Sequence, residues 1–201
     1  MPRGWPIVGW AAVGIAAMAA AILAGAGTGP DGIRVLIRAT ARTSAVLFTA
    51  AFVASSLVRV APGPATRWLL ANRRYLGVSF AVSHLVHFLA ILALAGWSFS
   101  RMGRDAGPVV GILGGGAYLF IIAMTVTSFD RTAAWLGPRW WQRLHTIGVY
   151  YIWGVFFVTF APHAFRSALY WPFAVGLLAA LAVRLRHGAA RHALAGLPAA
   201  R

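Results

Sequence analysis

Residues 73–88 read RRYLGVSFAVSHLVHF, and this stretch decides the fold. Two arginines, Arg73 and Arg74, stand before an apolar run, and two histidines, His84 and His87, lie within it. The run continues to about residue 97, which is long enough to cross a bilayer, since about 20 apolar residues span the hydrocarbon core. An imidazole inside such a span is costly and usually has a function. The stretch therefore indicates a membrane helix that carries a functional site.

The composition of the whole chain is that of an integral membrane protein. Of its 201 residues, 60% are hydrophobic and only 10% are charged, whereas about 25% are charged in a typical soluble domain. We expect a single all-α domain over residues 1–201, built as a six-helix membrane bundle. The first span has features of a signal peptide, but we expect it to stay attached. The predicted spans cover residues 7–26, 43–60, 75–97, 108–128, 144–161 and 168–185.

The distribution of arginine predicts how the chain sits in the membrane. The chain has 18 arginines and no lysine, against three acids, Asp31, Asp105 and Asp130. Twelve of the arginines fall in the two termini and in the loops over residues 59–74 and 131–143, and six fall in the other loops. By the positive-inside rule both termini are cytoplasmic. Because the arginines lie between apolar segments, we expect anionic lipids as partners and no nucleic acid.

The residue types that are missing exclude several classes of chemistry. Cysteine is absent, which rules out disulfides, thiol nucleophiles and iron–sulfur clusters. Glutamate is absent too, so paired carboxylates for acid–base catalysis are nearly excluded and we expect no catalytic residues. Histidine remains as the strong metal ligand, and zinc is disfavoured without cysteine or carboxylate partners. The run GILGGG, residues 111–116, lies within a span, where glycines favour close helix packing over phosphate binding.

A second informative stretch, PRWWQRLHTIGVYYIWGVFFVTFAPHAF, covers residues 138–165. His145 follows Arg143 closely, at the cytoplasmic end of the fifth predicted span. His163 lies 18 residues later, which is five turns of an α-helix and therefore the same helix face. The fifth span thus carries a histidine near each surface of the membrane.

Haem is the cofactor that these histidines and arginines favour. The third and fifth spans start on the same side of the membrane, so they run parallel and present their histidines to a shared apolar space. Histidine ligates haem iron, and arginine pairs with the haem propionates. The candidate iron ligands are His87, His145, His163 and His84. The candidate propionate partners are Arg73, Arg74 and Arg143.

Each histidine also has a simpler explanation, which the sequence leaves open. His84 could pack beside a ligand without binding iron, His145 could be an interfacial residue, and His163 could lie in a wet loop. We expect His187 and His192, in the basic tail, to be solvated.

The two stretches resemble the ferric reductase-like transmembrane domain superfamily, and within it the MsrQ/YedZ family of b-type haem membrane subunits. RRYLGVSFAVSHLVHF is similar to that family's arginine-pair, Leu-Gly and Leu-x-His run on the third helix, which aligns its haem histidine with His87. WWQRLHTIGVYYIW is similar to its Trp-x-Arg-Leu-His start of the fifth helix, which aligns a second functional histidine with His145. The family's further histidine on that helix corresponds to Val158. A haem on His87 would therefore be five-coordinate, or would pair with His163 or His84.

The resemblance covers the second to sixth spans and implies a function. It implies haem b held between the third and fifth helices, with a second haem as an alternative, in the bacterial inner (cytoplasmic) membrane. Electrons would come from a quinone pool or from a cytoplasmic redox partner protein, since we expect no flavin or nicotinamide domain in this chain. They would pass toward a periplasmic acceptor. The chain would be a redox subunit of a ferric reductase-like or methionine sulfoxide reductase-like system.

Two alternative functions stay open at this point. One is a membrane haem or gas-binding sensor or carrier, which a vacant iron coordination position would suit. The other is a haem-free transporter or scaffold whose histidines relay protons, and the lack of aspartate and glutamate in the predicted spans weighs against it.

Overall fold

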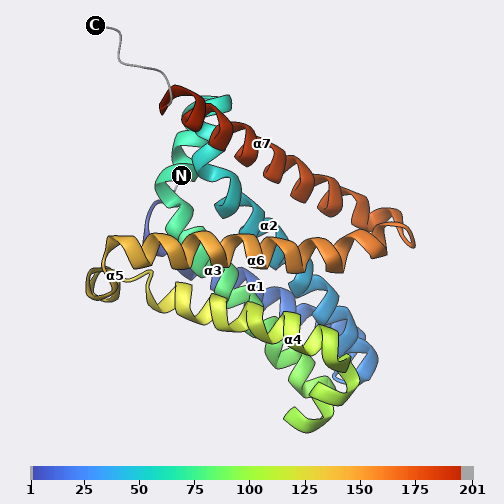
Figure 1. Ribbon diagram of the computed structural model, residues 1–201. Coiled ribbons are helices and arrows are strands. Elements are labelled where there is room, and N and C mark those ends of the chain that lie inside the picture. Colours follow the sequence, from blue (N-terminus) through green and yellow to red (C-terminus); the bar gives the residue numbers. More distant parts are fainter. Residues whose placement is uncertain (1, 196–201) are drawn as a thin grey trace, which may run out of the picture.

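Over the residues that it describes, a computed structural model of the chain is all-α, with six helices long and apolar enough to cross a membrane, as the sequence predicts. The structure describes the backbone of residues 2–195 and the side chains of residues 2–186, so His187 and His192 lie outside the described side chains. The long helices are α1 (Trp5–Ala26), α2 (Pro30–Val60), α3 (Pro64–Leu94), α4 (Phe99–Val126), α6 (Pro138–Ala164) and α7 (Trp171–Ala195) (Figure 1). Two short elements, α5 (Asp130–Leu136) and the 3-10 helix η1 (Ala168–Tyr170), precede α6 and α7. The third and fifth predicted spans therefore correspond to α3 and α6.

Several helices are longer than the spans that hydropathy predicts. α2 and α3 each have 31 residues, or about 46 Å at 1.5 Å per residue, against a hydrocarbon core of about 30 Å. Their polar first turns continue the helix outward, and each begins with a proline at a position where proline is well tolerated. In α4 the predicted span starts at residue 108, where the backbone of Gly107 (φ 71°) kinks the helix before Pro108. Hydropathy thus located the apolar parts of these helices and missed their polar extensions.

α2 and α3 pack along a seam of small, hydroxyl-bearing side chains. Ser44 of α2 donates a hydrogen bond to Ser83 of α3 at 2.9 Å between the two oxygens. Thr40 and Ser79 complete the seam, donating to carbonyls of their own helices, Leu36 O and Tyr75 O, both at 2.8 Å. All four of these hydroxyl residues are fully buried. Small residues allow close approach of membrane helices and hydroxyls add bonds between them, so the seam holds the histidine-bearing face of α3 in register with α2.

Three segments predicted to be cytoplasmic, the starts of α1, α3 and α5, meet at one end of the bundle, which we call the basic end. There the indole nitrogen of Trp68 donates to Pro2 O at 2.9 Å, and the backbone of Gly4 donates to Asn72 Oδ1 at 3.1 Å. Arg74 forms an ion pair with Asp130 at 2.7 Å. The starts of α1, α3 and α5 are thereby joined. That this end faces the cytoplasm stays a prediction from the arginine distribution.

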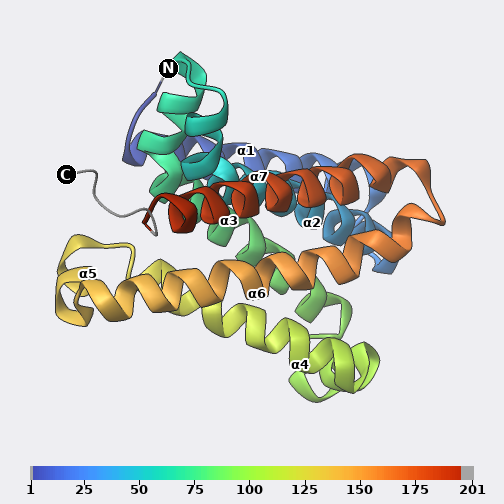
Figure 2. The same cartoon turned by 45° about the horizontal axis from the view of Figure 1, so that its top comes forward.

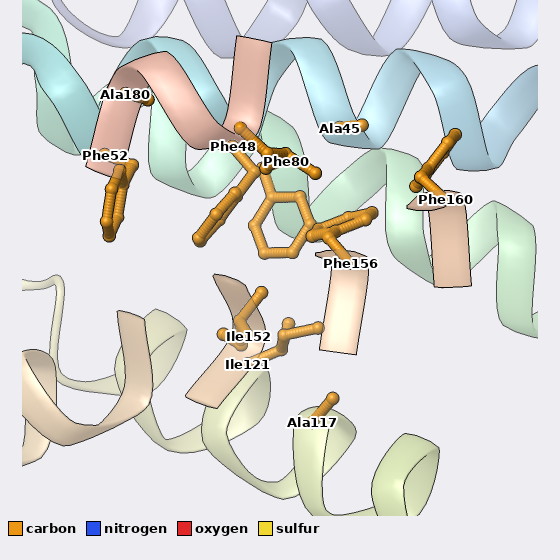
Figure 3. Packing of buried hydrophobic residues seen from close by; sticks show 11 residues of the cluster. Ala45, Phe48, Phe52, Phe80, Ala117, Ile121, Ile152, Phe156, Phe160 and Ala180 are labelled. Atoms are coloured by element: carbon orange, nitrogen blue, oxygen red, sulfur yellow. The ribbon is translucent and has the colours of Figure 1, made fainter. Parts of the chain in front are cut away.

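Phenylalanine rings fill the middle of the bundle where α2, α3 and α6 meet. We call this set the phenylalanine core, and Figure 3 shows its rings following one another between the helices. Each of these side chains is between 2% and 6% exposed. α6 lies between α7 and α4 (Figure 2). The phenylalanine core on the inner side of α6 joins this helix to α2 and α3. The phenylalanine core consists of Phe48, Phe52, Phe80, Phe156 and Phe160.

α4 packs on α6 through glycines that leave no room for a side chain. A Cβ atom added at Gly116 of α4 would meet the hydroxyl of Tyr151 and lie 2.8 Å from its Cζ. The Tyr151 hydroxyl donates to Leu113 O at 3.2 Å, so the ring cannot withdraw without breaking that bond. Gly116 ends the GILGGG run, so the close packing expected there is present at this residue.

We predict that Gly116→Ala destabilises the bundle by about 1–3 kcal/mol, because the new methyl group overpacks the contact with Tyr151. Gly114→Ala is the matched control, since a Cβ at Gly114 meets nothing within 4 Å. Thermal unfolding in detergent measures both variants. Equal melting temperatures for the two would contradict the close approach of α4 and α6.

Candidate functional site

A cavity of about 880 Å³ opens at the basic end between α2, α3, α4 and α6. Three rings of the phenylalanine core, Phe48, Phe52 and Phe80, form part of its wall. Sites for cofactors and drug-sized ligands occupy about 300–1,000 Å³ and are mostly apolar with a few polar groups. The cavity therefore has the size of a cofactor site, and its lining combines apolar side chains with arginines, hydroxyl groups and His145.

His145 of α6 lines this cavity and is held in one tautomer. The Thr127 hydroxyl donates to Ala123 O at 2.7 Å, so its oxygen accepts the N–H of His145 Nε2 at 3.1 Å. Trp141, one turn earlier, stacks on the imidazole with a centroid distance of 4.1 Å, and its indole nitrogen donates to Thr127 O at 2.9 Å. Because Nε2 carries the proton, Nδ1 carries the lone pair that a metal ion needs. His145 is a positioned, neutral ligand candidate.

Positive charge accumulates around the same cavity. Among the described residues, Asp130 is the one carboxylate in the lining, and it pairs with Arg74. Arg184 donates to Phe52 O at 2.7 Å, and its guanidinium lies 4.5 Å from the Phe52 ring centroid. The charges of Arg73 and Arg184 repel each other. The cavity thus favours an anionic group. Its arginines are Arg59, Arg73, Arg74 and Arg184.

The structure separates the three arginines predicted to pair with propionates. Arg73 and Arg74 line the cavity, whereas Arg143 is exposed and lies over Trp140, 5.2 Å from its ring centroid. Arg59 and Arg184 were not predicted as site residues, because the sequence does not show that α2 and α7 lie around the pair of α3 and α6. Their depth in the membrane was the available signal, since both lie at the ends of predicted spans on the same side as Arg74 and His145.

His87 of α3 faces α2 and is not among the residues that line the cavity. Its Nδ1 lies 3.1 Å from Ile37 O and 3.1 Å from Thr40 Oγ1. A carbonyl can only accept, and the Thr40 hydroxyl already donates to Leu36 O, so Nδ1 carries the proton. Metal-ligating histidines usually donate their second N–H to a carbonyl or carboxylate in this way. Nε2 of His87 is therefore left with a lone pair.

His84 lies beside His87, and the two imidazoles stack with a centroid distance of 5.0 Å. Phe80, Tyr118 and Phe156 surround its ring, with centroids 5.3, 5.1 and 5.8 Å away. Within the described part of the chain, His84 Nδ1 is buried and has no hydrogen-bond partner. A buried nitrogen without a hydrogen-bond partner is costly. Aromatic rings pack closely around His84, whereas His145 lines an open cavity.

His163 is exposed at the end of α6 far from His145. Its Nδ1 lies 2.8 Å from Thr159 O and donates to it, and its ring lies 5.1 Å from the ring of Tyr170. Among the described ring contacts, none joins His163 to His84 or His87, so the structure does not bring these candidate ligands together. Val158, which the resemblance aligns with a further histidine, is 53% exposed on the outside of the bundle.

The residues around the cavity fit haem b. They supply an imidazole whose Nε2–H bonds Thr127, the arginines Arg73 and Arg184 for two propionates, and apolar side chains over part of the lining. In the described residues there is no cluster of three or more His, Cys, Asp or Glu that could hold a bare metal ion.

The chain matches no protein-family model, no characterised protein and no solved structure in the comparisons made.

We predict that Thr127→Val releases His145 from its single tautomer, because valine keeps the shape of threonine and removes the acceptor for Nε2–H. Nitrogen-15 chemical shifts of labelled histidine report which ring nitrogen is protonated. The wild type is expected to show a protonated Nε2 and the variant a mixture of tautomers. Thr125→Val, which alters another threonine of the cavity wall, is the control. Unchanged His145 shifts in Thr127→Val would refute the assignment.

Proposed function

We propose that this chain is a b-type haem membrane electron-transfer subunit that holds haem b in the cavity beside His145. The observation that carries this proposal is the meeting, around one cavity of about 880 Å³, of a positioned imidazole, four arginines and aromatic walls. Haem is a large apolar ring with two anionic arms, so it needs these three features together. A bound haem would supply one-electron redox chemistry.

Each part of the cavity would have its own task. His145 would ligate iron through the ring nitrogen that does not bond Thr127, and Thr127 would keep the ring oriented. Arg73 and Arg184 would pair with the propionates, whose negative charge would offset the repulsion between the two arginines. The phenylalanine core would exclude water, and burial together with the axial ligand tunes the reduction potential.

The resemblance to the ferric reductase-like superfamily and its MsrQ/YedZ family supports the same function. On that basis His87 is the proposed ligand of a second haem, and the bond from its Nδ1 to Ile37 O is consistent with this role. We propose that a quinol or a cytoplasmic reductase delivers electrons at the basic end. The acceptor would then lie beyond the opposite membrane surface, and anionic lipids would neutralise arginines outside the cavity.

We predict that the purified chain shows the Soret and alpha bands of haem b on reduction, and that His145→Ala loses the haem of the cavity. His163→Ala is the control, because His163 is exposed and remote from the cavity, and it should keep the full haem content. Absorption spectra and the haem-to-protein ratio measure both.

A colourless wild-type protein would refute the proposed function. A haem-to-protein ratio that is the same in His145→Ala as in the wild type would refute the ligand assignment. The ratio in His87→Ala tells one haem from two, since a second haem on His87 would be lost only in that variant.

One observation favours a second function, a haem-based gas sensor or carrier. Among the described residues His145 is the one histidine that lines the cavity, so no second imidazole faces it there. Iron with an open coordination position binds gases. Rapid carbon monoxide binding without reduction by quinol would favour the sensor, whereas reduction by quinol would favour electron transfer.

A further inference from the structure

We infer that electrons leave this protein at an outer site formed by Arg42, Tyr170 and His163, which binds an anionic one-electron acceptor. Phe156 connects this outer site to the cavity. The inference rests on the proposed function for its electron source, haem b beside His145, and it adds the exit and the class of acceptor.

Aromatic rings in contact lead from the cavity to the outer site. Phe48 lines the cavity, and its ring centroid lies 5.3 Å from that of Phe156. Phe156 lies 5.9 Å from Phe160, which lies 5.7 Å from Tyr170. Tyr170 in turn lies 5.1 Å from His163. Figure 3 shows the first three of these rings arranged along the bundle.

The series of rings covers the depth that an electron has to cross. His145 and His163 are separated by 18 residues of one helix, or about 27 Å at 1.5 Å per residue, close to the hydrocarbon thickness of about 30 Å. Electron tunnelling decays less steeply through packed atoms than across gaps, so a contiguous set of rings couples the two ends.

Phe156 is the junction of this path. Besides Phe48, its ring touches Phe80 at 5.9 Å and His84 at 5.8 Å, and His84 stacks on His87. An electron that starts in the cavity, or at a second haem on His87, therefore reaches the outer site through the same ring. The same rings also pack the core, so a test has to separate coupling from packing.

The outer site has the charge of an anion site. The Arg42 guanidinium lies 4.9 Å from the Tyr170 ring centroid, and its Nε is buried without a hydrogen-bond partner in the described part of the chain. The two ion pairs formed by described residues are Arg34–Asp31 and Arg74–Asp130, so Arg42 has no carboxylate partner among these residues.

Neighbouring residues make the outer site still more positive. Arg38 lies one turn before Arg42 on α2, and Arg166 lies three residues after His163, just past the C-cap of α6. Because His163 Nδ1 donates to Thr159 O, its exposed ring keeps Nε2 as the free nitrogen. An acceptor that carries negative charge, such as an anionic iron(III) complex, fits this surface.

The step transfers one electron and breaks no bond. With ferricyanide as the probe, ferricyanide gains one electron to become ferrocyanide, and that electron would come from the reduced haem b that the proposed function places beside His145. No proton has to move for the charges to balance.

The kinetic test uses the full chain in right-side-out membrane vesicles, in which impermeant ferricyanide reaches the outer surface alone. Reoxidation of reduced haem is followed after rapid mixing, with vesicles that lack the chain as the blank. We expect Phe156→Leu and Tyr170→Leu to slow reoxidation severalfold, and Tyr170→Phe to keep the wild-type rate because it keeps the ring. Phe157→Leu is the control, since Phe157 stacks on Trp153 at 5.2 Å and has no described contact with the path.

The binding test needs no haem. Hexacyanocobaltate(III) has the charge and shape of ferricyanide but is not reduced, and calorimetry measures its binding to the haem-free chain in detergent. We expect the Arg42→Gln variant to bind one hexacyanocobaltate(III) ion fewer per chain than the wild type. Arg143→Gln, which changes an exposed arginine at the basic end, should bind as many of these ions as the wild type.

The outcomes separate the inference from the proposed function. Vesicles without haem bands refute the proposed function, and the anion site is still decided by calorimetry. Haem-bearing vesicles with equal rates for Phe156→Leu, Phe157→Leu and the wild type overturn the path. If Phe156→Leu fails to load haem, Tyr170→Leu decides, because Tyr170 is remote from the cavity. Identical isotherms for Arg42→Gln and the wild type overturn the outer site.

Discussion

Unbalanced positive charge at the edge of an apolar bundle is the constraint on which the other features of the structure depend. The chain has 18 arginines and three aspartates, and a buried cation without a partner is costly. At the cavity, Arg74 pairs with Asp130, the one carboxylate among the described lining residues, and Arg184 is stabilised by a carbonyl and two aromatic rings instead of an acid. Lipid phosphates can neutralise arginines on the surface, whereas Arg73 and Arg184 line the cavity and favour an anionic ligand there.

The packing of the helices explains why the cavity lies where it does. The hydroxyl seam holds α2 against α3, and Gly116 and Gly148 bring α4 close to α6. These two pairs meet across the phenylalanine core, which fills the middle of the bundle and stops short of the basic end. There, long polar side chains replace rings, and space remains beside His145. The same core that closes the middle of the bundle therefore supplies both the wall of the cavity and the ring contacts that lead away from it.

Sequence alone predicted the number and type of the long helices, because six apolar runs of membrane length are a strong signal. It also placed His145 at the depth of Arg74, since both stand near the starts of parallel helices, and both line the cavity. It could not predict that His87 bonds Ile37 of α2, or that Arg59 and Arg184 reach the cavity. Those contacts depend on which faces of the helices meet. In a uniformly apolar helix the sequence pattern carries little information about which face contacts a neighbouring helix.

A density map of the purified chain in a lipid nanodisc tests the central claim most directly. We predict a flat macrocycle in the cavity between α3 and α6, with its iron bonded to His145 and its two carboxylates beside Arg73 and Arg184. A cavity filled by lipid, water or side chains, or iron bound elsewhere in the bundle, would contradict it.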